Sequence, residues 1–147
     1  MEKSWTIEEI AFGSPLYALA LAFRDEHLRR PLGLSQSAED IAGESAQYHI
    51  AALDDGQIVG TVVLKPVSPT LLKLRQMAVA PLLRGTGLGA SIVRFAEATA
   101  QQRGFAEIEM TARVGAEGFY EKLGYAAAGE AFLEVTIPHV RMTKRLA

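Results

Sequence analysis

The sequence has 147 residues, among them no cysteine, one tryptophan and no long run of apolar residues. Without cysteine the chain forms neither disulfides nor zinc–thiolate centres, and nothing in it matches a membrane span of about 18 apolar residues. The first ten residues, MEKSWTIEEI, lack the basic and apolar segments of a secretory signal. We therefore expect a cytoplasmic protein with no membrane contact and no bound metal.

The net charge is also small, because 15 Lys and Arg residues stand against 17 Asp and Glu residues, which gives −2. Such a balance argues against binding nucleic acid over a large surface. Hydrophobic residues make up 49% of the chain, too high a fraction for a disordered protein. The length fits one domain, since domains usually have about 100 to 200 residues. We expect a single domain over residues 1–147.

The pattern of apolar residues predicts an α/β fold with a mixed sheet. Ser14 and Pro15 are typical of a helix start, and Asp55-Gly56 is typical of a hairpin turn. The periodicity over residues 87–103 predicts the clearest helix of the chain. In chain order we expect a strand at 4–10, helices at 15–30 and from 37, strands at 47–53, 57–64 and 71–79, a helix at 87–103, a strand at 105–112, a helix at 115–123, and two strands after 125.

Three glycines, Gly85, Gly87 and Gly89, stand between the strand at 71–79 and the helix at 87–103. Glycines let successive backbone N–H groups turn toward one point, and a helix N-terminus adds partial positive charge there. The loop therefore predicts an anion-binding nest suited to a phosphate group.

Two known phosphate loops fit this stretch poorly. A Walker loop ends in Gly-Lys-Ser/Thr, whereas this one ends in Leu88-Gly89-Ala90. The dinucleotide fingerprint fits formally, but it should open the first βαβ unit of a fold. Here the glycines follow a hairpin and lie past the middle of the chain, so we give that interpretation little weight.

The run RGTGLG at 84–89, preceded by MAV at 77–79, resembles the acyl-CoA signature of the GNAT family of N-acetyltransferases. A second segment, AEGFYEKLGY at 116–125, is similar to that family's other cofactor motif. The resemblance implies a mixed sheet of about six to seven strands with splayed central strands. It also implies transfer of an acetyl group from acetyl-CoA to a primary amine by direct attack in a ternary complex.

The same resemblance implies which residues hold acetyl-CoA. Backbone groups of the strand would bind the pantetheine arm, and the loop would bind the pyrophosphate. Local charge supports this, because residues 70–104 contain five basic residues and one acidic residue, 5 − 1 = +4. Arg113 stands where many members have asparagine, and it could contact the arm, a phosphate or an anionic substrate. The implied cofactor residues are Met77, Ala78, Val79, Arg84, Gly85, Thr86, Gly87, Leu88, Gly89, Ala90, Arg113 and Tyr120.

Tyr120 is the residue that the resemblance implies as general acid, since a phenol can protonate a departing thiolate. The alternative is a core tyrosine packed beside Phe119, which we expect in the core on either account. His139 is a candidate general base because of its intrinsic pKa, although a lone histidine is more often structural. Glu107 or Glu109 could also lie near the amine, and a water chain could take the proton.

The acceptor is expected to be a small-molecule or peptide amine. Residues 35–58 hold five acidic residues and no Lys or Arg, which suits a cationic amine and equally a solvated helix and turn. A rival function from another class is a non-catalytic acyl-CoA sensor or partner-binding module on the same fold. The sequence leaves the oligomeric state open, with a homodimer among the options.

Overall fold

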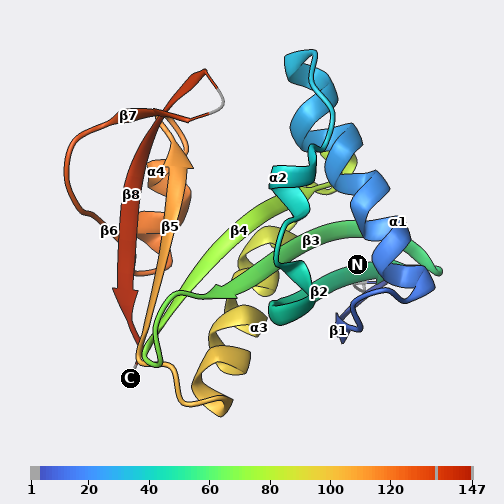
Figure 1. Ribbon diagram of the computed structural model, residues 1–147, viewed down its shortest axis with the longest axis horizontal. Coiled ribbons are helices and arrows are strands. Elements are labelled where there is room, and N and C mark those ends of the chain that lie inside the picture. Colours follow the sequence, from blue (N-terminus) through green and yellow to red (C-terminus); the bar gives the residue numbers. More distant parts are fainter. Residues whose placement is uncertain (1–3, 135, 147) are drawn as a thin grey trace. The chain divides into compact units, whose positions relative to one another are not determined.

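The computed structural model describes residues 4–134 and 136–146, and for Glu39 and Asp40 the backbone alone. Figure 1 shows both helices and strands along the chain, as the sequence predicted for an α/β fold. The elements are β1 (Trp5–Ile10), α1 (Pro15–Arg24), η1 (Asp25–Arg29), η2 (Arg30–Leu32), α2 (Ala38–Ile41), η3 (Glu44–Ala46), β2 (Tyr48–Asp54), β3 (Gln57–Pro66), β4 (Leu71–Val79), η4 (Pro81–Leu83), α3 (Leu88–Gln102), β5 (Glu107–Arg113), α4 (Glu117–Lys122), β6 (Ala126–Ala127), β7 (Phe132–Glu134) and β8 (Ile137–Arg145).

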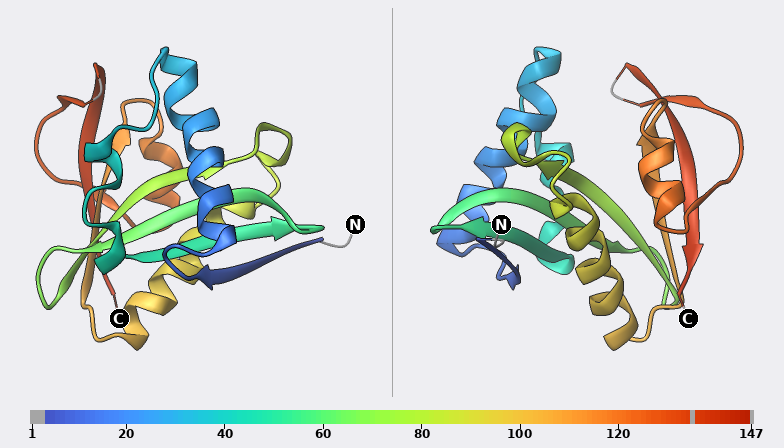
Figure 2. Two further views of the ribbon diagram at one scale, coloured as in Figure 1. Left: turned by 45° about the vertical axis from the view of Figure 1, so that its right-hand side comes forward. Right: turned by 180° about the vertical axis from the view of Figure 1, so that it is seen from behind.

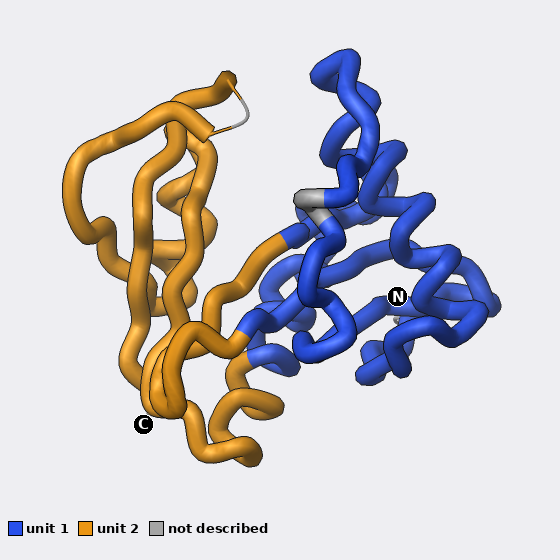
Figure 3. Tube along the Cα trace, in the orientation of Figure 1, with its two compact units in different colours: residues 1–65, 76–96 blue, residues 66–75, 97–147 orange. Residues whose placement is uncertain are grey.

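The chain divides into two compact units, which Figure 3 colours separately: unit 1 is residues 1–65 and 76–96, and unit 2 is residues 66–75 and 97–147. Strand β4 begins in unit 2 and ends in unit 1, while helix α3 begins in unit 1 and ends in unit 2. The hydrogen-bonded strand order is β1-β2-β3-β4-β5-β8-β6, with β7 also paired to β8. The described residues therefore form a sheet of eight strands, slightly more than the six to seven expected.

In unit 1, strands β1, β2 and β3 pair antiparallel. The turn between β2 and β3 consists of Asp55 and Gly56, with φ angles of 52° and 78°. Two successive positive φ angles are what a two-residue hairpin turn requires. The hairpin predicted from the sequence is therefore confirmed.

Helices cover both faces of the unit 1 sheet (Figure 2). Helix α1 packs through Ala20 against Ile10 and Ala51. On the other face, the start of α3 lies so near β3 that a Cβ atom at Gly60 would be 2.5 Å from Cδ1 of Ile92. A larger residue at Gly60 would therefore force the side chain of Ile92 to move.

Helix α1 begins as predicted, because Oγ of Ser14 accepts a hydrogen bond from the backbone N–H of Tyr17 at 3.2 Å. The helical path continues through the π-helical turn η1 and the 3₁₀ turn η2 and ends at Gly33, whose φ is 72°. A left-handed glycine is a common helix terminator. The second helix, α2, is much shorter than a typical helix, with four residues.

In unit 2, β8 is the central strand. It pairs antiparallel with β5 over seven residue pairs and also with β6 and β7. The first residues of β4 pair in parallel with β5, from Leu71 to Lys73. The splay of β4 and β5 beyond these pairs stays a prediction of the family resemblance.

The last turns of α3 are attached to the rest of unit 2 by Glu97. Its carboxylate accepts hydrogen bonds from the Tyr125 hydroxyl at 2.8 Å and from Nζ of Lys144 at 3.1 Å. Nζ of Lys144 also donates to the carbonyl oxygen of Leu123 at 2.7 Å. Glu97 thereby joins α3 to β8 and to the segment after α4. Among the described residues, no helix has the length and apolar character needed to cross a membrane.

Candidate functional site

The loop between β4 and α3 carries the predicted anion-binding nest, within unit 1. Gly85 and Gly87 have φ angles of 80° and 92°, and no atom lies within 4 Å of where a Cβ would stand at either one. These left-handed conformations favour glycine. Leu88, at the start of α3, is fully buried, whereas Gly85 and Gly87 are exposed.

Some backbone N–H groups of this loop are hydrogen-bonded within the fold, and others are left available to a ligand. The N–H groups of Arg84 and Thr86 donate to the carbonyl oxygens of Pro81 and Leu83, both at 3.3 Å. The first helical bond runs from Ser91 N–H to the Gly87 carbonyl at 3.0 Å. The amides of residues 88–90 therefore belong to the first helical turn, whose N–H groups have no intrahelical partner. Free N–H groups at the positive end of a helix favour an anion, in line with the predicted nest.

Two side chains of the loop have different roles. The Thr86 hydroxyl donates to the Leu83 carbonyl oxygen at 2.5 Å, so its proton serves to shape the loop. Arg84 is exposed, and its guanidinium makes no hydrogen bond or ion pair with the part of the chain that the structure describes. Arg84 can therefore add a positive charge to an anion at this loop.

Strand β4 leads into the nest through Met77, Ala78 and Val79. Ala78 is buried, and the side chains of Met77 and Val79 are half-buried. The residue before them, Gln76, has a φ of 54°, which is rare for a residue other than glycine. Its carbonyl oxygen accepts a hydrogen bond from the Thr61 hydroxyl at 3.1 Å.

Gln76 belongs to a buried polar network that the sequence reasoning missed. Arg24, 1% exposed, donates to Oε1 and Oε2 of Glu44 at 2.9 and 2.7 Å and to Oε1 of Gln76 at 3.3 Å. It also donates to Oε1 of Gln36 at 3.2 Å. The Tyr17 hydroxyl donates to Oε1 of Glu44 at 2.7 Å. Burial, followed by that bond to Glu44, raises the pKa of Tyr17 to about 12.

A signal for this network was present in the sequence. Arg24 follows Ala20 by four residues and Tyr17 by seven, so it lies on the buried face of α1. An arginine on a buried face needs a carboxylate partner. Glu44, one of the acidic residues counted between 35 and 58, is that partner, so part of this acidity is neutralised within the fold.

Tyr120 lies on α4 in unit 2. Its ring contacts those of Phe119 and Tyr125 edge-on, with centroid distances of 4.9 and 6.1 Å. Burial raises the pKa of Tyr120 to about 12. Its hydroxyl has no hydrogen-bond partner among the described residues, so it remains a protonated donor available to a ligand. Phe119 is 40% exposed, which contradicts its prediction as a core residue.

His139 lies at the start of β8, also in unit 2, with its side chain 8% exposed. Its Nδ1 is 2.8 Å from the Ile137 carbonyl oxygen. A carbonyl oxygen can only accept, so we assign the hydrogen to Nδ1. Nε2 is then the proton-accepting atom, and it lies 3.6 Å from Oε2 of Glu134. The Thr111 hydroxyl in turn donates to Glu134 at 3.1 Å.

The other candidates of unit 2 lie on β5. Arg113 is exposed, stands opposite His139 in the β5–β8 register, and makes no side-chain bond with the residues described. Glu109 accepts a hydrogen bond from Nε of Arg141 at 3.2 Å, so it is part of an ion pair. Glu107 precedes it by two residues and is half-buried.

The structure thus groups the predicted residues into two sets. Unit 1 holds the contiguous run 77–79 and 84–90. Unit 2 holds Arg113 and His139 side by side in the sheet, and Tyr120 on the following helix. Within the described ranges 4–134 and 136–146, no group of three or more His, Asp or Glu side chains could hold a metal ion.

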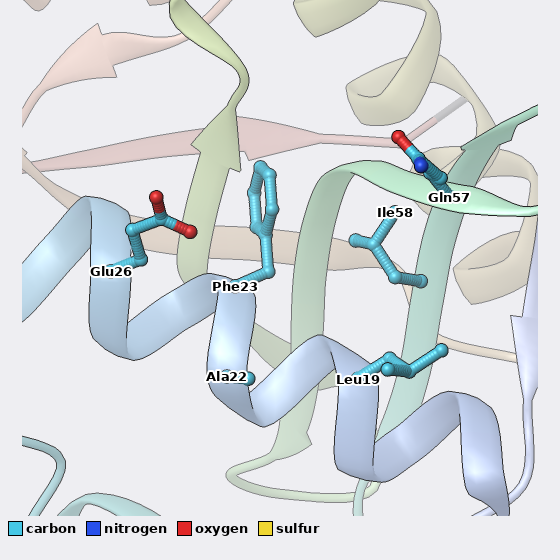
Figure 4. A pocket seen from close by; sticks show the side chains of 6 residues that line it. All are labelled: Leu19, Ala22, Phe23, Glu26, Gln57 and Ile58. Carbon is cyan, nitrogen blue, oxygen red and sulfur yellow. The ribbon is translucent and has the colours of Figure 1, made fainter.

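A separate depression of about 220 Å³ lies between α1 and β3 in unit 1 (Figure 4). Its walls are mainly apolar, with one carboxylate and one amide at the edge. The lining residues are Leu19, Ala22, Phe23, Glu26, Gln57 and Ile58. It contains none of the residues predicted to bind a cofactor.

Comparison with known proteins gives a consistent result. A family model described as an acetyltransferase (GNAT) domain matches residues 22–146. The uncharacterized protein YyaT of Bacillus subtilis is 35% identical over 99 residues, 67% of this chain and 66% of its own. A second Bacillus subtilis protein, provisionally named an acetyltransferase, is 38% identical over 97 residues, 66% of this chain and 65% of its own. The match spans slightly less than two thirds of each relative.

Solved structures extend the likeness to the whole chain. A crystal structure from Lactobacillus plantarum, provisionally described as an N-acetyltransferase, has a TM-score of 0.87 at 27% identity and covers 99% of this chain and 100% of its own. A GNAT acetyltransferase of Elizabethkingia anophelis with acetyl-CoA bound has a TM-score of 0.75 at 18% identity, covering 99% and 100%. At that identity the second likeness shows the fold alone.

Proposed function

Since this chain belongs to the GNAT acetyltransferase family, we propose that it transfers an acetyl group from acetyl-CoA to a primary amine by direct attack in a ternary complex. The observation that carries the proposal is the nest at residues 84–90. It offers to a phosphate group its backbone donors and an arginine that has no partner among the described residues. Acetyl-CoA supplies the acetyl group as an activated thioester together with such phosphates.

We propose the following cofactor contacts. The backbone of β4 at Met77, Ala78 and Val79 binds the pantetheine arm, and residues 84–90 bind the pyrophosphate. Arg113, exposed and without a partner among the described residues, binds a phosphate or the arm. The family fold is known with acetyl-CoA bound, in the Elizabethkingia anophelis protein, which supports the choice of cofactor.

For the chemistry we propose Tyr120 as general acid. Its hydroxyl donates a proton to the sulfur as the C–S bond breaks and the amine nitrogen bonds to the carbonyl carbon. Two properties suit it to this step. Burial keeps its pKa near 12, so it is fully protonated at neutral pH, and its hydroxyl is committed to no other described group.

We propose His139 as the group that accepts the proton lost by the attacking amine, through Nε2. The bond from Nδ1 to the Ile137 carbonyl fixes the ring, and the Glu134 carboxylate 3.6 Å from Nε2 stabilises the imidazolium once it forms. Glu109 is less suited, because its carboxylate is already paired with Arg141. The acceptor class, a small-molecule or peptide amine, the cytoplasmic location and the oligomeric state stay predictions.

Ligand-dependent thermal unfolding tests the cofactor proposal. A ligand present at 100 times its Kd stabilises the folded state by about 2.7 kcal/mol, which raises the Tm of a domain this size by several degrees. We expect this shift with acetyl-CoA and none with NAD or ATP at the same concentration. Stabilisation by NAD and none by acetyl-CoA would contradict the proposal.

Turnover separates the enzyme from the rival acyl-CoA sensor. The protein is incubated with acetyl-CoA and a panel of primary amines, and release of free thiol is followed. An acetyltransferase releases thiol in proportion to the acetylated amine. A sensor binds acetyl-CoA and releases none with any amine. The Tyr120 hydroxyl, which has no partner in the described part of the chain, favours the enzyme, because ligand binding alone does not require a proton donor.

A further inference from the structure

Gln76 is the point where the buried network of unit 1 meets β4, directly before Met77. Its side-chain oxygen Oε1 accepts two hydrogen bonds, from Nε of Arg24 and from Nε2 of Gln36, both at 3.3 Å. Both partners are donors, so the assignment of oxygen and nitrogen in this amide follows from the network. The NH₂ group of Gln76 consequently points away from Arg24 and Gln36.

This NH₂ group has no partner among the described residues. Among the described residues, every buried side-chain nitrogen and oxygen has a hydrogen-bond partner. The two N–H donors of Gln76 are therefore on accessible surface. A group that only donates recognises oxygen atoms of a carbonyl or carboxylate, and it gives nothing to an ammonium group.

The features that fix the orientation of this amide each cost free energy of folding. Gln76 has a φ of 54°, a conformation that is strained for its residue type. Arg24 and Glu44 are both buried, although removing two charges from water carries a large desolvation penalty. Gln36 is fixed in its turn, because its own backbone N–H donates to Oδ1 of Asp25 at 2.7 Å. Strained residues held in this way concentrate at functional sites.

Chain order indicates what the amide faces, and this step rests on the proposed function. If the pyrophosphate lies at residues 84–90 and the arm follows β4 back from Val79 to Met77, the thioester end lies nearest to Gln76. The amine that attacks the thioester must lie beside the same end. We propose that Gln76 is a specificity-determining residue that donates a hydrogen bond to a carbonyl or carboxylate oxygen next to the reacting amino group.

Matched pairs of amines test this. Phenylalaninamide and phenethylamine share a skeleton and differ by a carboxamide, as do lysine amide and 1,5-diaminopentane. The readout is the ratio of kcat/KM for the amide over that for the plain amine. Gln76→Glu keeps an oxygen for Arg24 and Gln36 but replaces the outward donors with an acceptor. We expect this ratio to fall about tenfold, with the Kd of acetyl-CoA within about twofold of wild type.

A second variant at Gln76 and a control variant at Gln57 test whether the change in the ratio comes from the Gln76 amide. Gln76→Gly suits the positive φ and removes the amide without adding charge, and it should lower the same ratio. Gln57→Glu makes the same chemical change at an exposed position of unit 1 outside the network, and it should leave the ratio unchanged. A ratio that stays within twofold of wild type in both Gln76 variants overturns the inference, as does a parallel loss of acetyl-CoA binding.

The test also distinguishes the two proposals. If wild type acetylates no amine of either type, the proposed function fails and this inference fails with it. If wild type acetylates amines and the ratio does not respond to Gln76, this inference alone fails.

Discussion

The two units differ in the kind of group they offer to a ligand. In unit 1 the candidate cofactor site consists mainly of backbone donors, presented by left-handed glycines and by the first turn of α3. In unit 2 the candidate groups are single side-chain atoms: the hydroxyl of Tyr120 and the guanidinium of Arg113 for the cofactor, and Nε2 of His139 as the candidate base. Binding through backbone groups depends on the conformation of the chain and little on which side chains are present. A function carried by side-chain atoms depends on the identity of those side chains.

The units also differ in how their buried polar groups are used. Unit 1 closes Arg24, Glu44 and Tyr17 into a network in which each charge has a partner. Unit 2 leaves the half-buried Tyr120 hydroxyl without a partner among the described residues. A network in which every polar group has a partner contributes to stability and positioning. A donor without a partner among the described residues is available for chemistry. Substitutions should therefore separate binding, turnover and stability between the units.

The largest effect is expected from Tyr120→Phe in unit 2. Removal of a general acid lowers turnover by about 10²- to 10⁴-fold. The Kd of acetyl-CoA and the unfolding free energy at pH 7 should change little, because the hydroxyl has no partner among the residues described. Steady-state kinetics, calorimetric titration and denaturant unfolding measure the three quantities.

The matched control is Tyr125→Phe, which removes a hydroxyl from the same unit. That hydroxyl donates to Glu97 at 2.8 Å, so its loss should cost about 1 to 3 kcal/mol of stability and leave turnover close to wild type. Equal turnover in wild type and Tyr120→Phe would remove the catalytic role and favour the acyl-CoA sensor.

A smaller effect, on binding, is expected from Gly87→Val in unit 1. A side chain at φ 92° strains the backbone and stands where a pyrophosphate would approach it. Loss of even one or two charge-assisted bonds of about 1.5 to 3 kcal/mol each should weaken acetyl-CoA binding by about a hundredfold or more. Calorimetric titration measures this Kd.

Gly13→Val is a control that separates the effect of backbone strain from the loss of acetyl-CoA binding expected for Gly87→Val. Gly13 also has a positive φ, 78°, with open space around its Cβ position, and it lies in unit 1 outside the nest. Both substitutions should lower stability by similar amounts, about 1 to 3 kcal/mol, but only Gly87→Val should affect the Kd. Acetyl-CoA affinity that survives Gly87→Val would contradict the nest.

The sequence predicted best what depends on local pattern. The hairpin at Asp55-Gly56 and the loop at Gly85 and Gly87 follow from backbone preferences of neighbouring residues. The eighth strand was missed because β6 has two residues and β7 has three, too few to show a period. The exposure of Phe119 was missed because a short helix such as α4 has no periodicity long enough to assign a buried face.

The network around Arg24 escaped for a different reason. Its members come from residues 17 to 76, and their contacts depend on tertiary packing that no local pattern encodes. The position of Arg24 on a buried helix face indicated that a partner was needed, yet several acidic residues could have served. The same holds for Glu134 beside His139, since that contact depends on the register of β7 with β8.

The smallest effect is a dependence of stability on alkaline pH, to which tyrosines of both units contribute. Burial raises the pKa of Tyr17 in unit 1 and of Tyr120 in unit 2 to about 12, while both ionise near 10 in the unfolded chain. Between about pH 10 and 12 the folded state keeps protons that the unfolded state has lost. Their contribution is therefore complete below pH 10 and is lost as the pH rises toward 12.

Each tyrosine should make the unfolding free energy fall by up to about 1.4 kcal/mol per pH unit in this window. Denaturant unfolding from pH 8 to 12 measures the slope. Tyr120→Phe should make it shallower and leave stability at pH 7 unchanged. Tyr17→Phe should also make it shallower, but it lowers stability at pH 7 as well, because Glu44 loses a buried hydrogen bond. Slopes equal to wild type in both variants would show that neither hydroxyl is buried in the folded state. The contrast between the bonded hydroxyl of Tyr17 and the hydroxyl of Tyr120, which has no partner among the described residues, would then fail.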